Sequence, residues 1–175
     1  MAGLIRPFNG IAPRIADSAF VAETAVIIGD VEIGPDANIW YGVVIRGDVN
    51  RIRIGPRTNV QDGTVIHVDA EGEHWNGVPT LIGGDVTIGH RAMLHACTLE
   101  DGAFVGMSAT VLDGAVVESG AMVAAGALVT PGKRIPKGQL WAGTPARYMR
   151  DLSADELAYF RVSAEHYVGL SRKYL

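Results

Sequence analysis

The sequence predicts an all-β fold, a parallel β-helix of six-residue repeats, followed by one C-terminal α-helix. Three observations support this prediction. Aliphatic residues recur every six positions along most of the chain, 22 of the 175 residues are glycine, and aromatic residues make up only 7%. Hexapeptide periodicity is a signature of the parallel β-helix. Its narrow prism core takes Val, Ile and Ala but leaves little room for large rings.

The six-residue period is most regular in the second half of the chain. Seven consecutive positions are in phase there: Val105, Val111, Val117, Val123, Val129, Ile135 and Trp141. The same spacing links residues 21 to 45, 54 to 66 and 82 to 94. Six is an even number, so every step keeps the side chain on one face of a strand, whereas an amphipathic helix needs steps of three and four. We therefore expect short strands joined at corners, with three repeats in each triangular coil.

Two insertions interrupt this ladder of anchor residues. Three extra residues separate Ile45 from Ile54, and ten extra residues separate Ile66 from Ile82. The ladder also restarts at Leu99 after a step of five residues. The ten-residue insertion is polar, which predicts a loop projecting from one corner of the prism.

A different pattern begins after the ladder ends. Residues 153–156, Ser-Ala-Asp-Glu, form a capping box, and the apolar positions after it follow helical spacing. Those positions are Leu157, Phe160, Ala164, Tyr167 and Val168. They predict an amphipathic helix from 153 to about 172. We expect a β-helix domain over 1–150 and a helical segment over 151–175 that packs on the β-helix or on a neighbouring subunit.

The composition narrows the location and the partners of the protein. Its 15 basic and 19 acidic residues give a net charge of −4 without a polybasic block, which argues against nucleic acid as a partner. The single cysteine, Cys97, excludes an intrachain disulfide and suits a reducing compartment. The N-terminus lacks a signal-peptide core, and the longest nearly apolar stretch, 121–128, is too short to span a membrane. We therefore expect a soluble cytoplasmic protein without a membrane partner.

Two of the five histidines share one phase of the repeat. His67 directly follows the anchor Ile66, and His95 directly follows the anchor Leu94. With the insertion skipped, these anchors are three repeats apart, which is one full coil. The two histidines are therefore expected to stack on adjacent coils about 4.8 Å apart, a separation that suits two ligands of one metal ion. Arg46 falls in the same file one coil earlier.

His90 has a different phase. It lies two residues after the anchor Ile88, at a corner of the prism, and cannot easily converge with the stacked pair of its own chain. In an assembly around a three-fold axis, the corner histidine of one chain would reach the pair of the next. Three neutral imidazoles leave the fourth position of a tetrahedral Zn²⁺ open for water, as in catalytic zinc sites. Asp62 occupies the corner below His90, where it would contact Arg46 across the same interface.

Four segments carry a resemblance to a known family. They are Arg46 to Asp48 (RGD), Asn59 to His67 (NVQDGTVIH), Gly89 to His95 (GHRAMLH) and Trp141 to Arg147 (WAGTPAR). In these segments the chain resembles the γ-class carbonic anhydrases, and the resemblance covers nearly its whole length. It implies a left-handed β-helix, a homotrimer with a metal at each subunit interface, and reversible hydration of CO₂ to bicarbonate by metal-bound hydroxide.

The resemblance also assigns site residues. The implied metal ligands are His67 and His95 of one subunit and His90 of its neighbour, and the other implied site residues are Arg46, Asp48, Asn59, Gln61, Asp62 and Tyr167. By this match Gln61 would orient the hydroxide, and Asn59 would line the pocket. Arg46 and Asp62 would form an ion pair between subunits, with Asp48 supporting it. The tyrosine would approach the site from the terminal helix.

One position departs from the family pattern. The best-known active member has a glutamate after the aspartate that matches Asp48, where this chain has Val49. Glu71, Glu73 or His74 of the inserted loop would have to export the proton instead. The expected metal is Zn²⁺, with Fe²⁺ or Co²⁺ as alternatives, because three imidazoles accept each of them. Two other functions stay open: a metal-dependent acyl thioester hydrolase and a non-catalytic metal-binding trimer of the same family.

Overall fold

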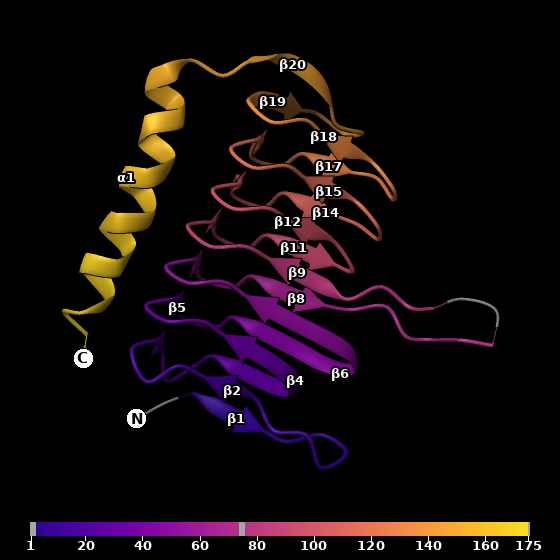
Figure 1. The fold of residues 1–175 in the computed structure, drawn as a ribbon, viewed down its shortest axis with the longest axis vertical. Coiled ribbons are helices and arrows are strands. Elements are labelled where there is room, and N and C mark those ends of the chain that lie inside the picture. Colours follow the sequence, from indigo (N-terminus) through magenta and orange to yellow (C-terminus); the bar gives the residue numbers. More distant parts are fainter. Residues whose placement is uncertain (1–2, 74–75, 175) are drawn as a thin grey trace.

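The computed structural model describes residues 3–73 and 76–174, and over these ranges the strands stack as a left-handed parallel β-helix of about 8 turns. One helix, α1 (Ala154–Ser171), runs alongside the prism (Figure 1). The predicted all-β fold with a C-terminal helix is confirmed. Within the described ranges, no helix has both the length and the apolar character needed to cross a membrane.

The strands form the three faces of a triangular prism. The first face contains β1 (Leu4–Arg6), the first part of β4 (Val26–Ile33) and of β6 (Val44–Ile54), β8 (Val65–His67), β11 (Met93–His95), β14 (Thr110–Val111) and β17 (Leu128–Val129). The second contains β2 (Arg14–Ile15), the later parts of β4 and β6, β9 (Thr80–Ile82), β12 (Thr98–Leu99), β15 (Val116–Val117) and β18 (Arg134–Ile135). The third contains β3 (Phe20–Val21), β5 (Asn38–Ile39), β7 (Asn59–Val60), β10 (Thr87–Ile88), β13 (Phe104–Val105), β16 (Met122–Val123) and β19 (Gln139–Ala142), with β20 (Arg147–Asp151) antiparallel to β19.

The six-residue anchors fill the core of the prism. Ile66 pairs in register with Ile45 on one side and with Leu94 on the other, so each anchor stacks on an anchor one coil away. All three are fully buried. Burial of each such side chain contributes about 1.5–3 kcal/mol to folding. At the end of the ladder, Trp141 is partly buried against the same core.

The three irregularities of the ladder lie at one corner, between the first and second faces. The register between β4 and β6 shifts there, so that residues 48–51 of β6 bulge outward. The described residues 68–73 and 76–79 belong to the segment between β8 and β9, which projects from the prism (Figure 1). After β11, the short step is closed by Ala96 with φ +49° and by the fully buried Cys97. Three successive coils therefore depart from the repeat at the same place.

The bend in β6 depends on two glycines. Gly29 of β4 has φ +78°, and a Cβ there would lie 2.2 Å from the carbonyl oxygen of Gly47 in β6. Any larger residue at position 29 would collide with the neighbouring backbone. This close approach fixes the point from which the bulge with Asp48 begins.

Helix α1 begins at the predicted capping box. The Ser153 hydroxyl accepts a hydrogen bond from the Glu156 N–H (3.2 Å), and the Glu156 carboxylate accepts one from the Ser153 N–H (2.9 Å). The helix then runs back over β10, β7 and β5 of the third face (Figure 1). Phe160 is buried there, and its ring stacks on Phe104 with 4.8 Å between centroids. Leu157, predicted on the buried face, is 39% exposed because it borders an open cavity.

Candidate metal centre

The two histidines of the first face lie side by side, as the repeat predicts. His67 ends β8 and His95 ends β11, and the two residues are register partners. His67 Nδ1 and His95 Nε2 are 3.2 Å apart, with 5.2 Å between the ring centroids. Both rings are half-buried at the irregular corner. The fold thus brings two imidazole nitrogens to one point of the surface.

A carboxylate holds the outer nitrogen of each ring. Asp48 Oδ1 is 3.0 Å from His67 Nε2, and Asp113 Oδ1 is 2.5 Å from His95 Nδ1. An ionised carboxylate only accepts hydrogen bonds, so these contacts favour the tautomer that carries the ring proton on the outer nitrogen and a lone pair on the inner nitrogen. Proteins orient metal-binding histidines in this way.

Asp113 is a site residue that the sequence reasoning missed. Leu94 pairs with Val111, so a count along the two strands places Leu112, and not Asp113, opposite His95. The carboxylate comes instead from the turn after β14, one residue further on. An Asp-Gly turn one coil beyond a candidate ligand was the available signal, but such turns also occur at corners that have no histidine.

Asp48 also forms an ion pair with Arg46. Burial of Asp48 raises the pKa of its carboxyl, but hydrogen bonds from His67 and Arg46 outweigh this effect and hold the pKa below its ordinary value. Asp48 is therefore ionised at neutral pH and can accept a hydrogen bond from the imidazole N–H. In the described chain Arg46 pairs with Asp48, and its expected pair with Asp62 of a neighbouring subunit stays a prediction.

His90 lies at a different corner, between the third and first faces. Its Nδ1 is 2.8 Å from Asp62 Oδ2, so Asp62 supports this histidine as Asp48 and Asp113 support the other two. The His90 side chain is 41% exposed. Among the described residues of one chain, no group of three His, Cys, Asp or Glu side chains is arranged to hold a metal. The stacked pair and the corner histidine are thus separate within a single chain.

Gln61 and Asn59 belong to a buried polar chain beneath α1. Gln61 Nε2 donates to Asn59 Oδ1 (3.0 Å), and Asn59 Nδ2 donates to Thr87 Oγ1 (2.9 Å). The Thr87 hydroxyl lies 3.2 Å from the hydroxyl of Ser163 on α1. Asn59 is fully buried and Gln61 is buried. A satisfied network of this kind fixes the Gln61 amide between the prism and the helix.

Gln61, His90 and Tyr167 line one cavity of about 310 Å³. The rest of its wall is mostly apolar and includes Phe104, Met107, Met122 and Tyr159. Burial raises the pKa of Tyr167, and the negative charge of Asp62 adds to this shift, so the phenol stays protonated over the neutral range. The cavity therefore joins a small polar end at His90 to an apolar wall under α1.

The inserted loop brings a candidate proton carrier to Asp48. Glu71 lines a cavity of about 290 Å³ together with Asp48 and Val49. Val49 is 45% exposed at the tip of the bulge. Glu73 is exposed and does not line this cavity, and His74 lies outside the described residues. Of the two described candidates, Glu71 is the one beside Asp48.

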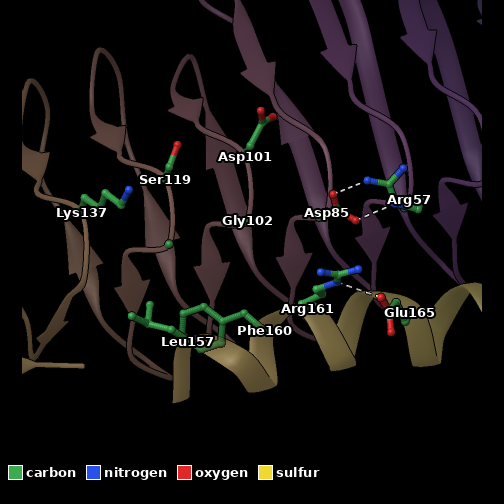
Figure 2. A pocket seen from close by; sticks show the side chains of 11 residues that line it. Arg57, Asp85, Asp101, Gly102, Ser119, Lys137, Leu157, Phe160, Arg161 and Glu165 are labelled. Carbon is green, nitrogen blue, oxygen red and sulfur yellow. Dashed lines mark hydrogen bonds and ion pairs between the residues drawn. The ribbon is translucent and has the colours of Figure 1, made fainter. Parts of the chain in front are cut away.

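A larger cavity of about 550 Å³ lies between α1 and the corner turns of the second and third faces (Figure 2). None of its lining residues belongs to either histidine site. Arg57 Nε lies 2.7 Å from Asp85 Oδ1, and Arg161 Nε lies 3.0 Å from Glu165 Oε1 (Figure 2). Because these charges satisfy one another locally, the size of the cavity alone does not indicate a catalytic site.

Comparisons with known proteins find a matching family model, similar sequences and similar solved structures. A family model described as bacterial transferase hexapeptide (six repeats) matches residues 12–47. The chain is 52% identical over 161 residues to gamma carbonic anhydrase 2, mitochondrial, of Arabidopsis thaliana, which covers 92% of this chain but only 58% of that protein. It is 39% identical over 171 residues to a carbonic anhydrase of Geobacillus kaustophilus, covering 98% of this chain and 91% of the relative. The crystal structure of a hexapeptide transferase family protein from Anaplasma phagocytophilum matches with a TM-score of 0.92 at 49% identity, covering 98% of both chains.

Proposed function

Because the chain belongs to the γ-class carbonic anhydrase family of hexapeptide-repeat proteins, we propose that it catalyses the reversible hydration of CO₂ to bicarbonate at a metal site shared between subunits of a homotrimer. The main support is that all three candidate histidines have one ring nitrogen held by a carboxylate. In each ring this leaves the other nitrogen as the metal ligand.

The donor set fits a divalent ion that prefers imidazole. His67 Nδ1 and His95 Nε2 are 3.2 Å apart, which two bonds of about 2.0–2.1 Å to one zinc ion can span. The third nitrogen would come from His90 of the partner subunit, because His90 of the same chain lies at another corner. Zn²⁺ is our first choice, with Fe²⁺ and Co²⁺ as alternatives. Bound there, the ion would supply the Lewis acidity that brings the pKa of a water molecule to about 7.

The residues of the chain would orient the reactants and move the proton. Gln61, held by its buried hydrogen-bond chain, presents its amide to the reacting water. The protonated phenol of Tyr167 donates a hydrogen bond from the same cavity. Arg46 keeps Asp48 ionised, so that Asp48 holds the adjacent imidazole in one tautomer. Glu71, beside Asp48 on an exposed corner, accepts the released proton and passes it to solvent.

Stopped-flow CO₂ hydration by the full chain tests this proposal, with Zn²⁺ or, under anaerobic conditions, with Fe²⁺. We expect metal-dependent activity that His95→Ala removes. His166→Ala is the matched control, because His166 is exposed on α1 and outside both histidine sites. An active His95→Ala variant would overturn the metal site. Full metal occupancy without hydration would instead support the non-catalytic trimer.

Mixed assembly tests whether subunits share the site. Chains carrying His90→Ala and chains carrying His95→Ala are each expected to be inactive. In a closed three-fold ring, each mixed trimer regains one intact site where an unaltered pair meets an unaltered corner histidine. Activity should therefore reappear on reassembly of the mixture. Mixtures as inactive as the separate variants would contradict a shared site.

Hydrolysis of an acyl thioester is a second candidate function. The apolar wall of the cavity at His90 favours it, since CO₂ needs far less space than about 310 Å³. A panel of acyl-CoA esters assayed with and without metal distinguishes the two activities. Absence of metal-dependent turnover across the panel would remove this candidate.

A further inference from the structure

We propose that Asp113 is a positioning residue for His95, which it holds in the tautomer and orientation that a metal ligand requires. The inference rests on the proposed function, in which His67 and His95 bind one ion. Asp113 itself lies outside the segments that resemble the family. Its assignment rests on the 2.5 Å contact between Asp113 Oδ1 and His95 Nδ1.

The turn that carries Asp113 is held on both sides by neighbouring coils. The N–H of Gly114 donates to the carbonyl oxygen of Ala96 (2.7 Å), next to His95 in the chain. The carbonyl oxygen of Asp113 accepts from the N–H of Gly132 one coil further on (2.8 Å). The backbone of the turn is therefore fixed relative to the imidazole. A carboxylate on such a turn costs little entropy to place.

The two carboxylates together favour a bound cation between the inner nitrogens of His67 and His95. Asp113 draws the proton of His95 to Nδ1, and Asp48 draws the proton of His67 to Nε2. Both inner nitrogens then carry lone pairs, which face each other at 3.2 Å. Two lone pairs at this separation repel unless a shared cation lies between them. Without Asp113, His95 could turn its proton inward and satisfy the pair with an ordinary N–H···N hydrogen bond, which would compete with metal binding.

A matched pair of variants separates this role from support of the turn. Asp113→Asn keeps the size of the side chain but replaces the obligate acceptor with a group that can also donate. Asp101→Asn is the control, because Asp101 also precedes a glycine in a corner turn and bonds the N–H of Gly84 (2.7 Å) rather than a histidine. Asp113→Glu tests whether a carboxylate on a longer side chain restores the effect.

Two measurements on the chain of 175 residues test the proposal. In metal-free protein, ¹H–¹⁵N correlation spectra of the imidazoles should show the His95 proton on Nδ1 in the wild type and in Asp101→Asn, and a shift toward Nε2 in Asp113→Asn. Competition with a chelator should show a loss of Zn²⁺ affinity of about 10–100-fold in Asp113→Asn, with partial recovery in Asp113→Glu.

The results separate this proposal from the proposed function. If Asp113→Asn keeps both the wild-type tautomer and the wild-type Zn²⁺ affinity, Asp113 does not position His95. If Asp113→Asn fails to fold, a His95 proton on Nδ1 together with a small loss of Zn²⁺ affinity in Asp113→Glu supports the role, and a tautomer on Nε2 in the wild type itself overturns it. If the tautomer and the affinity change while the wild type hydrates no CO₂, the proposed function fails and the role of Asp113 stands.

Discussion

The two halves of the prism differ in how strictly they follow the six-residue repeat. From Leu99 to Trp141 every anchor lies six residues after the last. From Ile45 to Leu99 the ladder breaks three times at one corner, and each break follows a member of the file that contains both stacked histidines. The coils of both halves bury aliphatic anchors, but each break frees corner backbone to present polar groups. The three candidate metal ligands thus all lie in the irregular half, whereas the core extends through both halves and Asp113 reaches His95 from the regular half.

An unpaired charge in the core of the regular half should give the largest loss of stability. Val117 is fully buried there, and Val117→Asp would place an unpaired carboxylate in the core, with a loss of about 4 kcal/mol or more. Circular dichroism should show an unfolded chain or a much lower Tm. Val162→Asp, at a position that is 55% exposed, should change stability by less than about 0.5 kcal/mol. Equal melting of the two variants would contradict the role assigned to the regular coils.

A polar substitution at the site should reduce activity more than it reduces stability. Gln61→Ala removes the amide that orients the reacting water, so kcat/KM for CO₂ should fall by about 10²-fold. Asn59 loses a buried partner, which costs about 1–3 kcal/mol. Gln139→Ala is the control, because that side chain only accepts from Trp141 Nε1 (2.9 Å). If both variants keep full activity, Gln61 has no part in the reaction.

The inserted loop should affect proton export without affecting the fold. Glu71→Gln is expected to lower kcat by about tenfold at low buffer concentration, with kcat/KM unchanged. The reason is that proton transfer to solvent limits kcat, whereas kcat/KM reports the interconversion of CO₂ and bicarbonate. Added imidazole buffer should restore kcat. Glu73→Gln serves as the control, since Glu73 does not line the cavity at Asp48. Identical buffer dependence in the two variants would rule out Glu71 as the carrier.

The smallest effect concerns the short step after His95. Burial raises the pKa of the Cys97 thiol to about 12, which keeps it a thiol at pH 8. Native protein should therefore resist iodoacetamide at that pH, while unfolded protein should react. The folded pKa lies above the unfolded value of 9.0. Ionisation of this thiol therefore leaves the free energy of unfolding unchanged below pH 9 and lowers it as the pH rises from 9 toward 12. Rapid labelling of native protein would show that the irregular corner opens.

Counting along the sequence predicted the positions that depend only on the repeat. The anchors, the stacking of His67 on His95 and the corner placement of His90 all follow from even steps of six. The same count failed where the backbone leaves the repeat. Asp113 reaches His95 from a turn, because side-chain reach at a corner is not set by strand phase. The count did place Asp62 at the corner below His90, but it did not predict that the Asp62 carboxylate contacts the His90 ring of the same chain.

The helix marks another limit of sequence reasoning. Its apolar spacing predicted a buried stripe but did not determine which face of the prism receives it. The contact between Thr87 and Ser163, which completes the polar chain of Gln61, therefore appears only in three dimensions. Leu157 shows the same limit, since it has the right phase but lies beside an open cavity.

The course of α1 has a consequence for folding kinetics. A solenoid whose coils touch only their neighbours can nucleate anywhere and grow coil by coil. Here the helix returns along the prism, and Tyr174 packs its ring against Phe20 (5.8 Å) and Trp40 (5.4 Å) of the early coils. These contacts join segments that are far apart in sequence, and such contacts form late because their loop-closure entropy must be overcome first. The aromatic edge of the early coils is therefore covered only when the far end of the chain has reached it.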